Sequence, residues 1–97
     1  MISQKEIHRI AVDHLFWQHP VNIAEKLCLI HSEVSEAMEA DRARDPVSSK
    51  TDVGEELADI VIRVLDLAEY LEIDLEAEVE KKHEVNKTRS IRHGKRY

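Results

Sequence analysis

The sequence predicts an all-α fold, in which one domain of four helices forms a bundle that is completed by oligomerisation. Composition is the first reason: 42% of the 97 residues are hydrophobic but only 4% are aromatic, and Gly and Pro occur twice each, as in helices joined by short turns. Apolar residues also recur at steps of three and four. Finally, a chain this short buries only a marginal core, so we expect association to bury more.

The first two helices are expected on either side of Pro20. Ser3 and Glu6 form a capping box that opens a helix ending near the sequence Gln-His-Pro, because Pro20 breaks helical hydrogen bonding. Asn22 then caps a second helix that runs to about residue 44. The core-facing stripe of this second helix, with steps of four, three, four and three, consists of Ile23, Leu27, Ile30, Val34 and Ala37.

A loop separates the second helix from the third. Residues 41–52 are polar and include a proline, which predicts a loop. The third helix is expected from about Val53 to about Leu71, and apolar residues cover more than half of its circumference. This pattern is typical of a central helix that packs on two sides, so a second copy of the chain is the expected partner.

Asp74 caps the fourth helix, which is expected to end between residues 87 and 90. Residues 90–97 form a basic tail of the single domain 1–97. Up to residue 84 the chain carries all 20 acidic residues and 9 of the 14 basic ones, a net charge of −11, whereas the remainder carries +5. The acidic body argues against binding a nucleic-acid polymer, and the tail either meets phosphate or is a solvated chain end.

Several localisations are disfavoured by the sequence. No stretch approaches the roughly 20 apolar residues that a membrane-spanning helix needs, so no membrane partner is expected. The first ten residues are polar and charged, unlike a signal peptide. The single cysteine, Cys28, rules out an internal disulfide framework and fits a reducing cytoplasm. A cytoplasmic protein is therefore expected.

Acidic pairs lie beside the apolar stripes of the two central helices. Glu33 and Glu36 form one pair, Glu56 and Asp59 form the other, and nineteen residues separate the two pairs. A spacing of three places each pair on one helical edge, and antiparallel packing would bring the pairs opposite one another. Clustered carboxylates repel one another in a partly buried site, which favours binding of Mg²⁺, with Mn²⁺ as a possible substitute. Acidic pairs on solvated faces are nevertheless the commoner case.

The fourth helix places polar residues where apolar ones would pack. Lys82, Asn86 and Arg89 continue the register of Leu75 and Val79. Arg and Lys suit phosphate oxygens, so together with the acidic pairs they indicate phosphoryl chemistry on a nucleotide. The phosphate-binding pattern G-x-x-x-x-G-K-[ST] is absent, so a metal would have to hold the phosphates. The alternative is that the bundle frays here and the three side chains are exposed.

These motifs together resemble the MazG-like all-α nucleoside triphosphate pyrophosphohydrolases. The resemblance covers roughly residues 22–97 and rests on Glu33-x-x-Glu36, Glu56-x-x-Asp59 and the Lys-x-x-x-Asn-x-x-Arg stretch from Lys82. It implies hydrolysis of (deoxy)nucleoside triphosphates between the α- and β-phosphates, releasing a monophosphate and pyrophosphate, in nucleotide-pool house-cleaning or control. It also implies a dimer or tetramer of this chain.

The resemblance also implies roles for the motif residues. Glu33, Glu36, Glu56 and Asp59 match the Mg²⁺ ligands, and the helix-four residues Lys82, Asn86 and Arg89 match phosphate-binding positions. The expected reaction is in-line attack of a metal-activated water on phosphorus. A carboxylate, Glu33 or Glu36, is expected to be the catalytic base.

Four further residues are candidates for substrate contact. Trp17 could stack on a base, although a core position is favoured. Lys26 shares a helical edge with Glu33 and either contacts phosphate or, as we expect, pairs with an acid. His93 and Lys95 flank Gly94, which permits a turn that would close the basic tail over the triphosphate; a disordered end is equally compatible.

Two other readings remain open. A di-iron carboxylate bundle would use Glu-x-x-His motifs on two helices, and the chain has one, Glu80-x-x-His83. A non-enzymatic helical module that dimerises and presents its basic tail explains the apolar faces. It does not explain why acidic and basic residues lie at matching inward positions.

Overall fold

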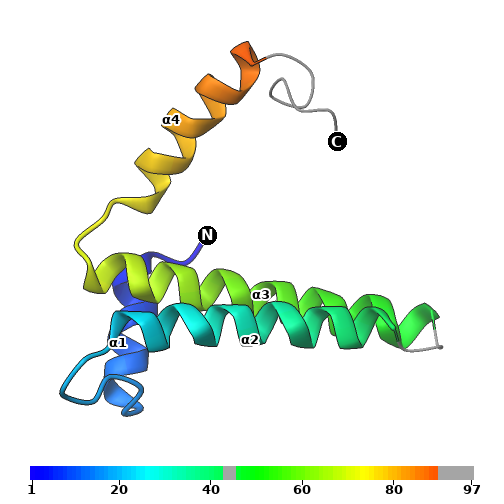
Figure 1. Ribbon diagram of the computed structural model, residues 1–97, viewed down its shortest axis with the longest axis horizontal. Coiled ribbons are helices and arrows are strands. Elements are labelled where there is room, and N and C mark those ends of the chain that lie inside the picture. The colour runs from blue at the N-terminus through cyan, green and yellow to red at the C-terminus, as the bar shows by residue number, and fades with distance from the viewer. Residues whose placement is uncertain (43–45, 90–97) are drawn as a thin grey trace.

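The computed structural model describes residues 1–42 and 46–89, and for residues 46–51 it describes the backbone alone. Four helices follow one another along the chain: α1 (Gln4–Asp13), α2 (Ile23–Asp41), α3 (Pro46–Tyr70) and α4 (Leu75–Thr88) (Figure 1). The described residues contain no strand, so the all-α prediction is confirmed. Among these helices none combines the length and apolarity required to cross a membrane.

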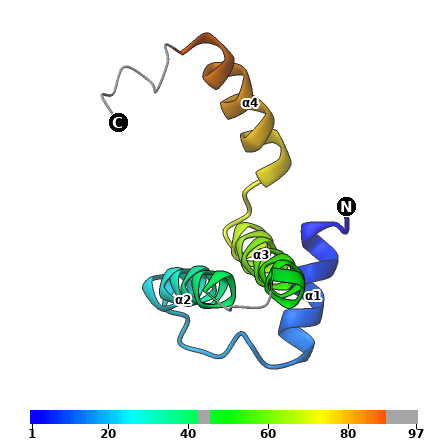
Figure 2. The ribbon, with the colours of Figure 1, turned by 90° about the vertical axis from the view of Figure 1, so that its right-hand side faces the viewer.

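The helices α2 and α3 form an antiparallel hairpin, against which α1 packs on the α3 side (Figures 1 and 2). The last helix, α4, extends away from the other three. The radius of gyration is 16.1 Å, whereas a compact domain of this length has a radius of about 12.5 Å. A single chain is therefore three packed helices with a projecting fourth, and the four helices do not close into a bundle within it.

The first helix begins as expected and ends early. Ser3 is its N-cap and accepts a hydrogen bond from the backbone N–H of Glu6. The helix ends at Asp13 in a Schellman motif, because Leu15 adopts a φ of 66°, its N–H donates to the Val12 carbonyl and the next N–H donates to the Ala11 carbonyl. The expected end near Pro20 is therefore wrong, and residues 14–22 form an irregular connection.

The hairpin differs from expectation at its turn. Asn22 caps α2 as predicted, but the helix ends at Asp41, short of the expected residue 44. The third helix starts at Pro46, so the loop predicted over 41–52 is shorter than expected. Proline at the first helical position is favourable, since its missing N–H would have no helical partner.

The turn between α3 and α4 is fixed by hydrogen bonds. The third helix ends in a second Schellman motif, with Glu72 at a φ of 59°, and Asp74 caps α4 as predicted. The Gln4 side chain donates to the Ile73 carbonyl at 2.6 Å and accepts from the Leu75 N–H at 3.2 Å. The start of α1 thereby fixes the point at which α4 leaves the hairpin.

Little apolar surface is fully buried within one chain. Among the described residues only Leu67 and Ala68 form a buried apolar core. Val61 and Ile62 on α3 and Val79 on α4 remain 43%, 47% and 58% exposed. Between α3 and α4 lies a mainly apolar groove of 1080 Å³, which Val61 and Val79 line from opposite sides. The chain therefore presents a continuous apolar surface where α4 departs.

Candidate active site

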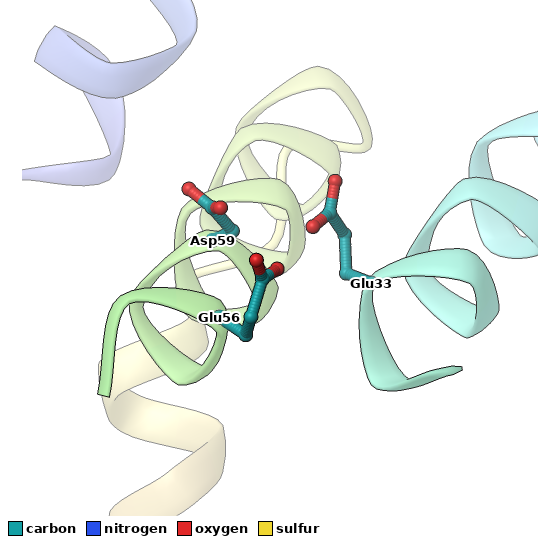
Figure 3. A group of neighbouring side chains, drawn as sticks. All are labelled: Glu33, Glu56 and Asp59. Carbon is teal, nitrogen blue, oxygen red and sulfur yellow. The ribbon is translucent and has the colours of Figure 1, made fainter. Parts of the chain in front are cut away.

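Three carboxylates from the two central helices converge. One oxygen each of Glu33, Glu56 and Asp59 lies within 4.8 Å of the others. Figure 3 shows Glu33 extending from α2 towards α3, which carries Glu56 and Asp59 one turn apart. Glu33 is buried, Glu56 is half-buried and Asp59 is exposed. The antiparallel hairpin thus builds a cluster that is closed at Glu33 and open at Asp59.

Two oxygens of this cluster have unmet bonding capacity. Glu33 Oε2 and Glu56 Oε2 are buried and accept no hydrogen bond within the described residues. A buried polar atom without a partner costs about 1–3 kcal/mol, and a charged one costs more. Mg²⁺ and Mn²⁺ prefer carboxylate oxygens, so these orphaned atoms and the donor set fit a hard divalent cation.

Glu36 lies at the edge of the cluster. It is exposed, and its carboxyl group faces that of Glu56 closely enough to share a hydrogen bond when one of them is protonated. The pKa of Glu56 is raised above its ordinary value. The largest cause is burial, followed by the neighbouring Glu36 carboxyl group and then by the negative charges of Asp59 and Glu33. All four sequence-predicted acids are therefore neighbours, with three in a tight group and Glu36 beside Glu56.

Arg63 reaches the cluster and was not predicted from the sequence. Its Nε donates to Glu33 Oε1 at 2.6 Å, and the two side chains are 33% and 10% exposed. Arg63 lies four residues after Asp59 and seven after Glu56, so all three share one face of α3. That spacing was the signal available in the sequence. The ion pair joins α2 to α3 and gives the buried Glu33 a counter-charge.

The predicted phosphate ligands lie elsewhere. Lys82, Asn86 and Arg89 are exposed on the projecting α4, and the structure does not bring them to the acidic cluster of the same chain (Figure 1). Their expected inward position is wrong for a single chain, because α4 does not pack along the hairpin. Their role in binding phosphate stays a prediction.

Trp17 belongs to an aromatic cluster at the open end of the hairpin, where α3 ends. Its indole stacks on Tyr70, with ring centroids 4.4 Å apart, and its Nε1 lies 2.9 Å from each Asp66 carboxylate oxygen. His8 Nδ1 lies 2.6 Å from Asp66 Oδ1, so α1, the connection and α3 meet at one carboxylate. The half-buried position agrees with the favoured core role.

The remaining candidates have different outcomes. The Lys26 ammonium lies 4.2 Å from the centre of the Trp17 ring and donates to the Phe16 carbonyl. The described residues include no acid paired with Lys26, so the expected ion pair is wrong. His93 and Lys95 lie outside the described residues.

Comparison with known proteins identifies a relative of this chain. A dATP/dGTP diphosphohydrolase from cyanophage S-2L is 32% identical over an alignment of 78 residues, and the alignment covers 76% of this chain and 67% of the relative. No protein-family model matches the chain. No solved structure matches it either.

Proposed function

Because the chain belongs to the family of this dATP/dGTP diphosphohydrolase, we propose that it hydrolyses (deoxy)nucleoside triphosphates to the monophosphate and pyrophosphate in a Mg²⁺-dependent reaction. The observation that carries the proposal is the convergence of Glu33, Glu56 and Asp59, with orphaned buried oxygens on the first two. A site of this kind suits a metal–triphosphate complex, since a divalent cation binds carboxylate and phosphate oxygens together.

The acidic residues would divide the work between metal binding and proton transfer. Glu33, Glu56 and Asp59 would hold the cation, with Glu36 beside them. When bound, Mg²⁺ supplies Lewis acidity that favours ionisation of water and neutralises phosphate charge. Of the two candidate bases we favour Glu36, because it is exposed to solvent whereas Glu33 is buried and held by Arg63. Glu36 would then accept the proton of the attacking water.

We further propose that the working form is a dimer or tetramer in which a second copy supplies the phosphate ligands. The groove of 1080 Å³ beside Val61 and Val79 offers an apolar surface for that copy. The projecting α4 carries Lys82, Asn86 and Arg89 away from its own hairpin. The same helix of a partner, lying across the hairpin, would bring these residues to the acidic cluster.

The rival functions fit the structure less well. A di-iron bundle would need Glu80 and His83 in a shared centre, but both are exposed on α4, away from the acidic cluster. A purely structural module accounts for the exposed apolar surface but leaves the orphaned oxygens of Glu33 and Glu56 without a purpose. An oligomeric nucleoside triphosphate hydrolase accounts for both features, and we propose a cytoplasmic role in nucleotide-pool house-cleaning or control.

The direct test is pyrophosphate release from a panel of nucleoside triphosphates that includes dATP and dGTP. We expect release with Mg²⁺ or Mn²⁺, none with chelator, and none from an Asp59→Asn variant. Glu55→Gln provides the matched control, because Glu55 is an exposed neighbour on the same helix that the cluster does not include. Absence of pyrophosphate from every triphosphate, or release of only inorganic phosphate, would contradict the proposed reaction.

A further inference from the structure

Arg63 is anchored at one end of its guanidinium. The Nε atom donates to Glu33 Oε1 at 2.6 Å, whereas the described residues include no hydrogen-bond partner for the two terminal amino groups. Glu33 is 10% exposed and Arg63 is 33% exposed, so the guanidinium extends from the buried carboxylate towards solvent. An arginine held through Nε keeps its planar, two-pronged end free and oriented.

The free end of Arg63 borders a second cavity. A polar pocket of 480 Å³ lies beside the connection between α1 and α2, and Arg63 forms part of its wall. Lys26 and Asn22 line the same pocket, with Asn22 capping the start of α2. Glu25 also contributes one negative charge. Arg63 is the residue that borders both this pocket and the acidic cluster, and the N-terminal end of α2 adds a positive partial charge on the far side of the pocket.

We propose that Arg63, held by Glu33, binds the triphosphate of the substrate through its two terminal amino groups. This inference rests on the proposed function, and it adds a phosphate ligand that belongs to the same chain as the acidic cluster. Fixing Nε removes most of the conformational freedom of the side chain before substrate arrives, so less entropy is lost when phosphate binds. The spacing of Arg63 from Asp59 places the guanidinium one turn from the cation site.

The loss of Arg63 should affect the affinity for metal and the affinity for phosphate in different ways. Removing a positive charge beside the cluster reduces electrostatic repulsion of the metal cation. The affinity for the metal should therefore stay the same or rise. The same change removes a charge-assisted contact to phosphate. A residue that only held Glu33 in place would instead lower the affinity for both ligands together, because Glu33 binds the metal and the metal binds the triphosphate.

The experiment compares two ligands by titration calorimetry on the full chain. Mn²⁺ alone reports on the acidic cluster, and α,β-methylene-dATP with Mn²⁺ reports on triphosphate binding without hydrolysis. For Arg63→Gln we expect unchanged or tighter Mn²⁺ binding and about tenfold or more weaker binding of the analogue. Arg9→Gln is the matched control, because Arg9 also donates through Nε to a glutamate, Glu6, at the exposed surface of α1.

Arg63→Lys separates the role of charge from that of the forked end. Lysine keeps a positive charge beside Glu33, so this variant should fold even if Arg63→Gln is unstable. We expect the affinity for the analogue to fall several-fold and the affinity for Mn²⁺ not to fall. Unchanged analogue binding in both variants, or an equal fall in both affinities, would overturn the assignment. Failure of the wild-type protein to bind the analogue or release pyrophosphate would instead contradict the proposed function.

Discussion

The carboxyl group of Glu36 on α2 faces that of Glu56 on α3, and this contact is one of the causes that raise the pKa of Glu56. Two neighbouring carboxylates repel each other when both are ionised, and a proton on one of them or a cation between them relieves that repulsion. The pair therefore links the protonation state of the hairpin to its stability. It also explains why the same place suits a divalent metal.

The first prediction concerns pH in the absence of metal. A carboxyl group whose pKa is higher in the folded state than in the unfolded one stabilises the fold fully below its ordinary pKa of about 4.3. That contribution is lost as the pH rises through the raised value. In chelator, urea denaturation should therefore show the Glu56 contribution falling as the pH rises above the ordinary pKa of a glutamate. Glu56→Gln should flatten this part of the profile relative to Glu55→Gln, and identical slopes would contradict the prediction.

The second prediction concerns metal. Mg²⁺ or Mn²⁺ should raise the Tm at neutral pH, because a ligand that binds only the folded state stabilises it by mass action, about 2.7 kcal/mol at a hundredfold excess over Kd. Glu56→Gln and Asp59→Asn should abolish the rise while the helical circular dichroism spectrum persists. A Glu55→Gln variant, which changes an exposed neighbour, should still show the rise in Tm. An unchanged melting curve at saturating metal would count against a shared site.

The third prediction concerns self-association. Light scattering at micromolar concentration should give at least a dimer, since the exposed side chains of Val61 and Ile62 leave apolar surface that a second copy would bury. Val61→Glu should shift the mass towards the monomer. Val12→Glu should not, because Val12 is 44% exposed on α1 but does not line the groove. A wild-type monomer with full activity would refute the shared assembly.

The fourth prediction concerns Arg89. Arg89→Ala should lower kcat/KM for a nucleoside triphosphate about ten- to a hundredfold, because a charge-assisted phosphate contact contributes roughly 1.5–3 kcal/mol. The Tm should barely change, since the side chain is exposed at the end of α4. Arg42→Ala serves as a control for the loss of one exposed arginine, at the C-cap of α2. Full activity of Arg89→Ala would also weaken the assignments of Lys82 and Asn86.

Three of the four helix starts and the ends of α3 and α4 were predicted from the sequence, whereas the end of α1 and the start of α3 were not. Ser3, Asn22 and Asp74 each accept a hydrogen bond from a backbone N–H three residues later, and such short-range capping is visible in the sequence. The stop of α1 at Leu15 uses left-handed backbone without glycine, so no residue type announced it.

The acidic cluster was predictable because its spacing within each helix is local and the hairpin is antiparallel. The ion pair between Arg63 and Glu33 was not, since a contact between helices depends on how each is rotated about its axis. The position of α4 was missed for another reason. Its apolar residues indicate burial but do not identify the chain against which they pack, and Val79 remains exposed within its own chain.

The departure of α4 from its own hairpin has a genetic consequence. If each centre combines the carboxylates of one chain with α4 of another, two inactive variants can complement each other. Asp59→Asn damages the carboxylate half and Arg89→Ala damages the α4 half, so a mixed dimer concentrates both defects in one centre and leaves the other intact. For randomly re-formed dimers of strongly impaired variants, half of the molecules are mixed and about a quarter of wild-type activity returns. Co-expression of the two alleles would thus restore a function that neither allele provides alone.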